Sequence, residues 1–349
     1  MGEAAVVDEV FPDERPVFVV GAPRSGTTLL QAILDASPNI GIADELTFFD
    51  TILKAQPQLP DLTAPGAIDR LQSLMPKMDH VRYWSDPEAV VAELGRRLRA
   101  DPQPSWPRVF LYLMRAWADR KGAARCGDKT PWNIRHMETL LRWFPRAQIV
   151  HIVRDPRAQI ASRRKLPRTS QDVLSNAIKW KLDIDCARRL QATPEQFLEI
   201  RYEDLVTTPA ETVQRVCEFL DEPFEPQMIA GRDSAELAFR GQAYKEGVTK
   251  AVNANSLTSW RRELNASQVR LIEWITGGHF AHYRYERDGS SLGTLAKLPL
   301  QAVQECLAWL RFKREEKSFL AADSGIEIRH DSGDLLRSLW RARHSGGSR

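Results

Sequence analysis

The chain has 349 residues and a nearly balanced charge, with 49 Lys and Arg residues against 46 Asp and Glu residues. This length exceeds the roughly 250–300 residues at which a single hydrophobic core usually stops growing, so we expect one large domain with an appendage. The net charge of +3 does not indicate a nucleic-acid-binding protein, and the four widely spaced cysteines indicate free thiols in a reducing compartment, not a disulfide framework or a zinc site.

Residues 1–15 are expected to form a loose leader. The first part of this segment, residues 1–9, is acidic and contains no long apolar run. No secretory signal or transmembrane anchor is visible there. We therefore expect a cytoplasmic protein.

The stretch Pro16–Leu30 carries the most informative motif of the sequence. An apolar strand (Val17–Val20) leads through Gly21 and four further residues to Gly26, and a helix with apolar residues on one side follows. Backbone N–H groups of such a loop and the positive N-terminus of the helix converge on one anion. The spacing is that of a P-loop, but Thr27 stands where ATP-binding loops have a lysine. A loop without that lysine indicates a nucleotide ligand without a triphosphate.

The following region changes from sheet-like to helical patterns. A short apolar piece that begins at residue 40 ends at Asp44 and Glu45. Residues 50–115 show no clear strand, contain many prolines, and have helical patterns over 87–98 and 109–117. An insertion of this size between two strands predicts a helical cap over the site.

A second unit of strand and helix carries another candidate anion site. We expect a strand at 148–153, after which Asp155 caps a helix that begins with proline. Arg154 then lies at the carboxyl end of the strand, where open α/β sheets bind ligands. Ser162 lies about two turns along the helix, on nearly the same face as Asp155. Arg154 and Ser162 can therefore hold a second phosphate.

The remaining patterns complete an α/β fold. We expect helices at 130–144, 209–220 and 267–281, a strand at 197–202, and a glycine-rich irregular stretch at 224–260. The predicted fold class is α/β, with a P-loop-type parallel sheet flanked by helices, a helical insertion and a C-terminal helical extension. The main domain would span residues 16–288.

Together, the two anion-binding motifs resemble the sulfotransferases that use 3′-phosphoadenosine 5′-phosphosulfate (PAPS). Residues 24–28 look like that family's 5′-phosphosulfate loop, and Arg154 through Ser162 looks like its 3′-phosphate site. The resemblance covers about residues 15–286 and is closest to the branch of tyrosylprotein sulfotransferases and their bacterial relatives. It implies transfer of the sulfuryl group of PAPS to a hydroxyl of a small-molecule or peptide acceptor, without a metal ion, and release of 3′-phosphoadenosine 5′-phosphate (PAP). The cofactor-binding residues that it implies are Arg24, Ser25, Gly26, Thr27, Thr28, Arg154, Ser162, Tyr202 and Lys250.

The resemblance also implies the catalytic residues. Glu45 matches, without a gap from Arg24, the glutamate that serves as general base in tyrosylprotein sulfotransferases. Lys129 precedes Thr-Pro-Trp in what we expect to be a fixed loop, and it would neutralise charge on the departing phosphate oxygen. Tyr202 resembles the tyrosine that the family places beside the adenine or its phosphate, with a purely packing role as the alternative. The insertion at 50–115 would bind the acceptor.

Parts of the cofactor site depart from the family pattern. The segment around Lys250 resembles the loop that closes over PAPS. Ser259, however, stands where tyrosylprotein sulfotransferases have a cofactor-binding lysine. One of the basic residues 163–165 would replace a family arginine, and the sequence does not identify which one.

The histidines give no clear signal. His151 lies in mid-strand between apolar neighbours, so we expect it in the core. His80 and His136 could reach the acceptor, but nothing in the sequence selects either of them.

Two other functions compete with sulfuryl transfer. A P-loop nucleotide or small-molecule kinase would have a lysine at position 27 and an acidic metal ligand at a strand end, where Thr27 and Arg154 stand. A catalytically silent nucleotide-binding or scaffolding protein is the third hypothesis. The presence of both Glu45 and Lys129 argues against it.

Residues 289–349 lie beyond the resemblance. Leu300, Val303, Leu307 and Leu310 form an apolar stripe at helical spacing. We expect this helix to pack on its own domain or across a homodimer, and not to bind a membrane. A disordered polar tail would follow.

Overall fold

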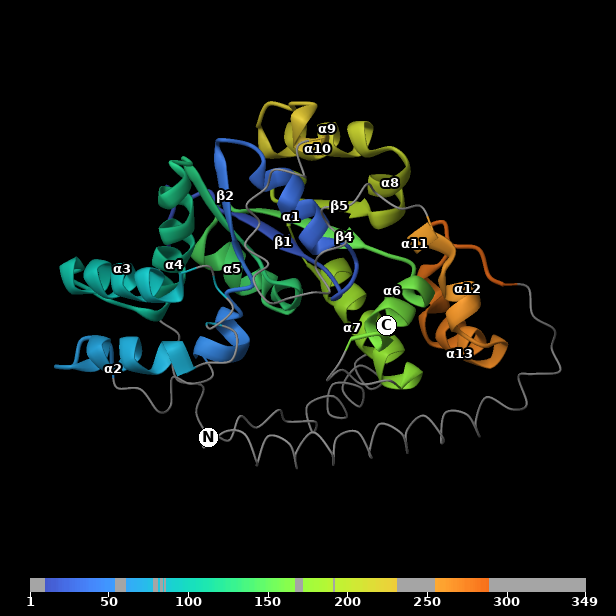
Figure 1. Ribbon diagram of the computed structural model, residues 1–349, viewed down its shortest axis with the longest axis horizontal. Helices are drawn as coiled ribbons and strands as arrows, with labels where there is room; N and C mark the ends of the chain where they lie inside the picture. The colour runs from blue at the N-terminus through green and yellow to red at the C-terminus, as the bar shows by residue number, and fades with distance from the viewer. Residues whose placement is uncertain are drawn as a thin grey trace, which may run out of the picture.

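A parallel sheet forms the centre of the molecule (Figure 1). The computed structural model describes residues 10–53, 61–77, 81, 84, 86–166, 172–190, 192–230 and 255–288. The sheet has five strands in the order β2-β3-β1-β4-β5, and each neighbouring pair is parallel. The strands are β1 (Val17–Val20), β2 (Ile40–Asp44), β3 (Arg125–Lys129), β4 (Gln148–Val153) and β5 (Phe197–Arg201). The predicted α/β fold is confirmed.

Helices connect the strands along the chain. The α-helices are α1 (Thr27–Asp35), α2 (Ala67–Leu74), α3 (Pro87–Ala100), α4 (Trp106–Lys121), α5 (Met137–Trp143), α6 (Pro156–Arg164), α7 (Val173–Arg189), α8 (Tyr202–Thr207), α9 (Pro209–Leu220), α10 (Gln227–Ala230), α11 (Asn255–Thr258), α12 (Trp260–Glu263) and α13 (Ala266–Thr276). Shorter turns of other helix types are η1 (Phe48–Ile52), η3 (Met75–Lys77), η5 (Pro131–Arg135) and η8 (Gly277–His279). Among the described helices, none combines the length and the apolar character that a membrane crossing requires.

Alternate residues of the central strand β1 enter two different apolar cores. Phe18 and Val20 pack in a core with side chains of α3, α4 and α5. Val17 and Val19 pack in a second core with side chains of α1 and α9. This alternation is that of a strand covered by helices on both faces, which is why β1 reads as a continuous apolar run.

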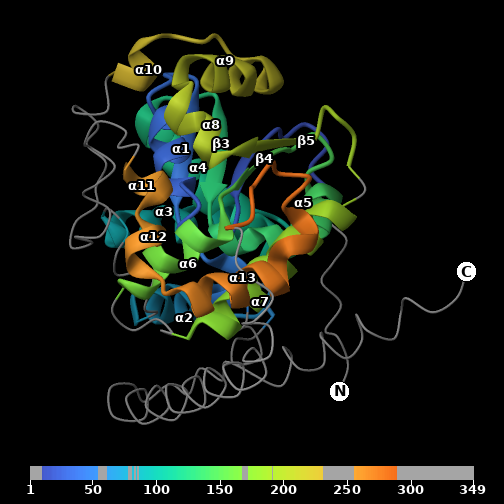
Figure 2. The ribbon, with the colours of Figure 1, turned by 90° about the vertical axis from the view of Figure 1, so that its right-hand side faces the viewer.

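A third apolar cluster joins helices from distant parts of the chain. Residues of α6, α7, α12 and α13 pack together there, and Figure 2 shows these helices gathered below the sheet. Ile160 of α6 and Trp260 of α12 are both buried in this cluster. The cluster therefore holds α6, which carries Ser162, beside the segment that contains α11 and α12.

The described parts of the region 50–115 contain helices and no strand, as the sequence predicts, but the last helix packs on the sheet. Helix α4 continues to Lys121. It packs so closely on β2 that a Cβ atom at Gly41 would lie 2.6 Å from the Cα atom of Ala118. The boundary predicted at residue 115 thus falls inside a helix that covers the sheet. The role of the insertion in acceptor binding stays a prediction.

The prediction of a loose leader is wrong for its described part, residues 10–15. The backbone N–H of Phe11 donates to the carbonyl of Trp143 at 2.7 Å, and its ring stacks on Phe144 at 5.2 Å. Partial burial of this aromatic side chain against the first apolar core attaches the segment to the domain. Residues 1–9 lie outside the described residues.

Several elements were not predicted from the sequence, among them strand β3, helix α7 and the short helices α8, α10, α11 and α12. Strand β3 contains Lys129 as its last residue, so the prediction of a fixed loop around Lys129 is wrong. Its sequence, Arg-Cys-Gly-Asp-Lys, lacks the apolar pattern of a strand. The side chains of Asp128 and Lys129 are buried because they bind residues 45 and 46. Cys126, Cys186 and Cys217 are free thiols, as expected, and Cys306 lies outside the described residues.

Candidate active site

Candidate residues from all five strands meet at one edge of the sheet. Because every neighbouring pair is parallel, the carboxyl ends lie together, and ligands of open α/β sheets bind at such an edge. Residues 24–28 follow β1, Glu45 follows β2, Lys129 ends β3, Arg154 follows β4, and Tyr202 follows β5.

The glycine loop after β1 presents backbone groups at the start of α1. Arg24 and Gly26 both have left-handed backbone conformations, with φ of 76° and 99°. Helix α1 begins with Thr27 and Thr28, and no side chain caps it at Gly26. Its first N–H groups have no partner within the helix, which makes this end suited to an anion. The side chain of Gln159 on α6 fixes the loop by donating to the carbonyl of Pro23 at 2.5 Å.

Arg154 connects the loop to the segments that follow it in the chain. Its Nη1 donates to the carbonyl of Arg24 at 2.9 Å, and its Nη2 donates to the carbonyl of Ser256 at 2.8 Å. The guanidinium lies over the ring of Tyr202, 4.3 Å from the centroid, and the Tyr202 hydroxyl is 3.0 Å from Oγ of Ser256. A Cβ atom at Gly26 would be 2.4 Å from this ring. Tyr202 therefore packs between the glycine loop and Arg154.

The structure shows a contact of Ser162 that the sequence does not identify. Its hydroxyl accepts a hydrogen bond from Nε of Arg24 at 3.3 Å. The two predicted phosphate sites are thus joined through Arg24, which contacts Ser162 by its side chain and Arg154 by its carbonyl. That Arg154 and Ser162 hold one phosphate stays a prediction.

Each of the two predicted phosphate sites contains a buried polar atom that has no hydrogen-bond partner among the described residues. These atoms are Oγ of Ser25, whose residue is 0% exposed, and Nε of Arg154, whose residue is 7% exposed. A buried donor without a partner costs about 1–3 kcal/mol, and a ligand in the predicted phosphate sites would remove that cost at Ser25 and Arg154. Both atoms fit a ligand that carries anionic oxygens.

Glu45 and Lys129 form an ion pair at the carboxyl ends of β2 and β3. Nζ of Lys129 donates to Oε1 of Glu45 at 2.7 Å. The Lys129 side chain is completely buried, whereas that of Glu45 is 21% exposed. An acid–base group thus lies at the surface of the site with a cation directly behind it.

The basic residues 163–165 differ in their surroundings. Burial lowers the pKa of Arg163, and the positive charges of Arg135 and Arg24 lower it further, against the opposing effect of Asp183. Lys165 is exposed and pairs with Glu263 at 2.6 Å. The charge of Arg24 thus acts on Arg163, while Arg164 donates to Oε1 of Gln268 at 3.4 Å.

The structure places His151 and His136 in different surroundings. His151 is 0% exposed, so the prediction of a core histidine is confirmed, and its Nδ1 lies 2.8 Å from Oε2 of Glu199. His136 stacks on the ring of Phe49 at 4.3 Å. His80 and Lys250 lie outside the described residues.

Sequence reasoning missed residues that contact the predicted site from outside the motifs. Ser256 supplies a carbonyl to Arg154 and a hydroxyl to Tyr202. Asp128 and Thr130, on either side of Lys129, are both 0% exposed and bind the backbone that follows Glu45. The available signal was their position beside Lys129, since buried polar residues in a strand need local partners.

Comparisons with known proteins agree with this geometry. A family model described as "Sulfotransferase family" matches residues 16–226. The chain is 27% identical over 270 residues to a putative protein-tyrosine sulfotransferase of Caenorhabditis briggsae, with 74% of this chain and 85% of that protein covered. It is 30% identical over 160 residues to a putative protein-tyrosine sulfotransferase of Caenorhabditis elegans, covering 43% of this chain and 62% of that protein. The fold is similar to that of the sulfotransferase domain of the Synechococcus PCC 7002 olefin synthase, with a TM-score of 0.54 and 21% sequence identity. The similarity covers 82% of this chain and 99% of that domain.

Proposed function

Because the chain belongs to the sulfotransferase family, we propose that it transfers the sulfuryl group of PAPS to a hydroxyl of an acceptor, with Glu45 as general base. Family membership by itself makes the chain a transferase that moves sulfuryl groups. The donor, the base and the acceptor are the content of the proposal.

The observation that supports PAPS most strongly is the pair of buried polar atoms without described partners, Ser25 Oγ and Arg154 Nε. One belongs to each predicted phosphate site, and Arg24 contacts residues of both sites. A donor with phosphate groups at its 3′ and 5′ positions would engage both atoms, whereas a 5′-triphosphate would engage only the loop. The proposed donor-binding residues are Arg24, Ser25, Gly26, Thr27, Thr28, Arg154, Ser162 and Tyr202, together with Lys250.

The chemistry divides between Glu45 and Lys129. PAPS, when bound, supplies the sulfuryl group and a 5′-phosphate that leaves with the electrons of the broken S–O bond. Glu45 accepts the proton of the acceptor hydroxyl as its oxygen attacks, a role for which a partly exposed carboxylate at the edge of the site is suited. Lys129 is fully buried behind Glu45, so it would stabilise the leaving phosphate by its positive charge and not by direct contact.

The acceptor class is the least defined part of the proposal. The relatives are named protein-tyrosine sulfotransferases, which supports a phenolic hydroxyl, on a peptide or a small molecule, as the first acceptor to test. The chain spans less than two thirds of the length of some of the curated relatives that it matches.

Isothermal titration calorimetry of the full chain with PAP and with ATP–Mg²⁺ tests the donor. The proposal predicts that PAP binds far more tightly, because the site has residues for a 3′-phosphate and lacks the lysine that binds a γ-phosphate. ATP–Mg²⁺ binding as tightly as PAP would overturn the proposal in favour of a kinase.

A further inference from the structure

The backbone that follows Glu45 is fixed by the segment that carries Lys129. Three consecutive N–H groups, of residues 45–47, donate to three consecutive residues, 128–130. The contacts are Glu45 N to the carbonyl of Lys129 at 3.1 Å, Leu46 N to Oδ1 of Asp128 at 3.1 Å, and Thr47 N to Oγ1 of Thr130 at 3.2 Å. Two of the three acceptors are side chains, so this is not the continuation of the ladder between β2 and β3.

The conformation held by these contacts is not one that the chain adopts readily. Glu45 and Thr47 have left-handed backbone conformations, with φ of 40° and 47°. Residues other than glycine avoid this region, and they keep it only where the surroundings impose it. Side chain and backbone of Glu45 are both oriented by Lys129, through the ion pair and the carbonyl.

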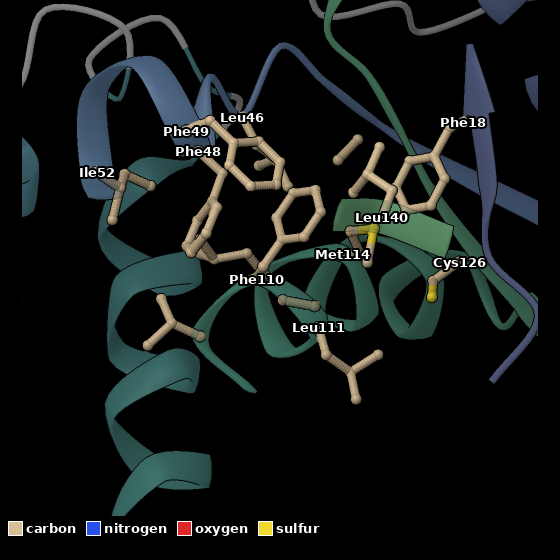
Figure 3. Close-up of a cluster of buried hydrophobic side chains, with 14 of the residues drawn as sticks. Phe18, Leu46, Phe48, Phe49, Ile52, Phe110, Leu111, Met114, Cys126 and Leu140 are labelled. Atoms are coloured by element: carbon tan, nitrogen blue, oxygen red, sulfur yellow. The ribbon is translucent and has the colours of Figure 1, made fainter. Parts of the chain in front are cut away.

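Asp128, which accepts the N–H of Leu46, is itself held in place. Asp128 is 0% exposed, and its second oxygen, Oδ2, accepts from Nδ2 of Asn133 at 2.7 Å. The Leu46 side chain is buried in the apolar cluster, and Figure 3 shows it beside Phe48 and Phe49. Leu46 is therefore anchored on two sides, by its N–H at Asp128 and by its side chain in the core.

We propose that Asp128 and Thr130 are positioning residues that hold the carboxylate of Glu45 in place for proton removal. The inference rests on the proposed function, because it assigns the two residues to the orientation of that base. Neither residue is proposed to contact the substrates. Their effect comes from geometry: displacing a catalytic group by about 1 Å costs roughly 10²-fold in rate.

Conservative variants separate positioning from simple burial. Thr130→Val keeps the shape and removes the acceptor for Thr47, and Thr130→Ser restores a hydroxyl. Asp128→Ala removes the acceptor for Leu46. Asp128→Asn keeps it, and Asn133 can turn its amide to present Oδ1, an atom that has no hydrogen-bond partner among the described residues. Asp35→Ala is a control for the loss of a carboxylate that accepts a backbone N–H elsewhere in the sheet. Asp35 accepts from Ile42 at 3.1 Å, although its side chain is 32% exposed and also pairs with Lys121.

The first measurement is steady-state turnover with PAPS and an acceptor that the wild type uses, alongside PAP affinity by calorimetry. We expect kcat to fall about 10²-fold in Asp128→Ala and about tenfold in Thr130→Val, with PAP affinity unchanged. Thr130→Ser, Asp128→Asn and Asp35→Ala should retain most of the activity. Equal losses of kcat in Asp128→Ala and Asp35→Ala would show general destabilisation and overturn the inference.

The second measurement does not depend on activity. Amide hydrogen exchange of the full chain, read by mass spectrometry, should become faster at residues 45–47 in Asp128→Ala and Thr130→Val, and not in Asp35→Ala. Unchanged exchange at residues 45–47 in both variants would overturn the positioning role. A wild type that transfers no sulfuryl group would count against the proposed function, while the exchange result would still decide whether these residues fix the Glu45 backbone.

Discussion

Nζ of Lys129 lies 2.7 Å from Oε1 of Glu45, and the two side chains differ in exposure: that of Lys129 is fully buried and that of Glu45 is 21% exposed. A buried cation needs a compensating charge, whereas a partly exposed carboxylate can be hydrated. The pair thus places a carboxylate at the edge of the site with its charged partner inside the protein.

Glu45→Gln should lower turnover by about 10²–10⁴-fold while PAP affinity stays unchanged, because the amide cannot accept the proton. Its carbonyl oxygen can still accept from Lys129, so the fold should be retained. Steady-state kinetics and calorimetry measure the two quantities, with Glu138→Gln on the exposed face of α5 as a control. Near-normal turnover would move the base elsewhere, and His136 would be the next residue to test.

Because Lys129 is buried and Glu45 is partly exposed, substitutions of the two residues should differ in their effect on the free energy of unfolding. Glu45→Ala removes the carboxylate that contacts the buried Lys129 and should destabilise the fold by up to about 3–5 kcal/mol. Lys129→Met replaces the buried cation by an apolar side chain of similar length and should cost much less. Denaturant unfolding of both variants measures this, and a larger loss in Lys129→Met would contradict the account.

Arg154→Ala should weaken PAP binding by roughly 2–5 kcal/mol, the range seen when one member of a buried charge pair is removed. Binding of AMP, which has no 3′-phosphate, should change much less. Arg154→Lys keeps the charge but loses the two-pronged geometry, so it should only partly restore PAP affinity. Equal losses for PAP and AMP would place the effect of Arg154 away from the 3′-phosphate.

Gly26→Ala should reduce both stability and PAP binding. Its Cβ would lie 2.4 Å from the ring of Tyr202, at a φ of 99°. Gly66→Ala is a matched control, because Gly66 has a φ of 75° but no atom of the described residues within 4 Å of the added Cβ. The control should lose about 1 kcal/mol from backbone strain alone, with PAP binding intact. Similar behaviour of the two variants in melting and calorimetry would argue against the close contact with Tyr202.

The stability of helix α3 should depend on pH through Glu93. Hydrogen bonds from Arg96 have the largest effect on the pKa of Glu93. Together with the smaller effect of Arg97, they outweigh desolvation and lower this pKa from 4.5 to about 2. A lowered pKa in the folded state means that the stabilisation is complete above pH 4.5 and is lost as the pH falls towards about 2. The free-energy difference between wild type and Glu93→Gln, from urea unfolding, should therefore shrink with falling pH across this window. A difference that does not vary with pH would contradict the assignment.

The elements that could be predicted from sequence are those whose signals are local. Val17–Val20, the glycines of the loop and the cap at Asp155 each carry their own pattern over a few residues, and Asp155 accepts from the N–H of Arg157 at 2.8 Å as a cap should. Apolar runs, glycine spacing and helix caps need no knowledge of the rest of the chain.

The parts that could not be predicted depend on contacts between distant segments. Strand β3 has Asp128 and Lys129 where apolar residues are expected. Asp128 accepts the N–H of Leu46, and Lys129 pairs with Glu45, both on the neighbouring segment. The hydrogen bond from Arg24 to Ser162 joins residues 138 positions apart in the chain. No pattern within either segment contains that information.

The most direct test of the central claim is label transfer to hydroxylated acceptors, including tyrosine peptides and simple phenols, with two donors in parallel. Radiolabelled PAPS and γ-labelled ATP–Mg²⁺ are each incubated with the wild type and with Glu45→Gln. The account predicts transfer from PAPS only, release of one PAP per label transferred, and loss of nearly all transfer in Glu45→Gln. Transfer from ATP with none from PAPS would contradict it.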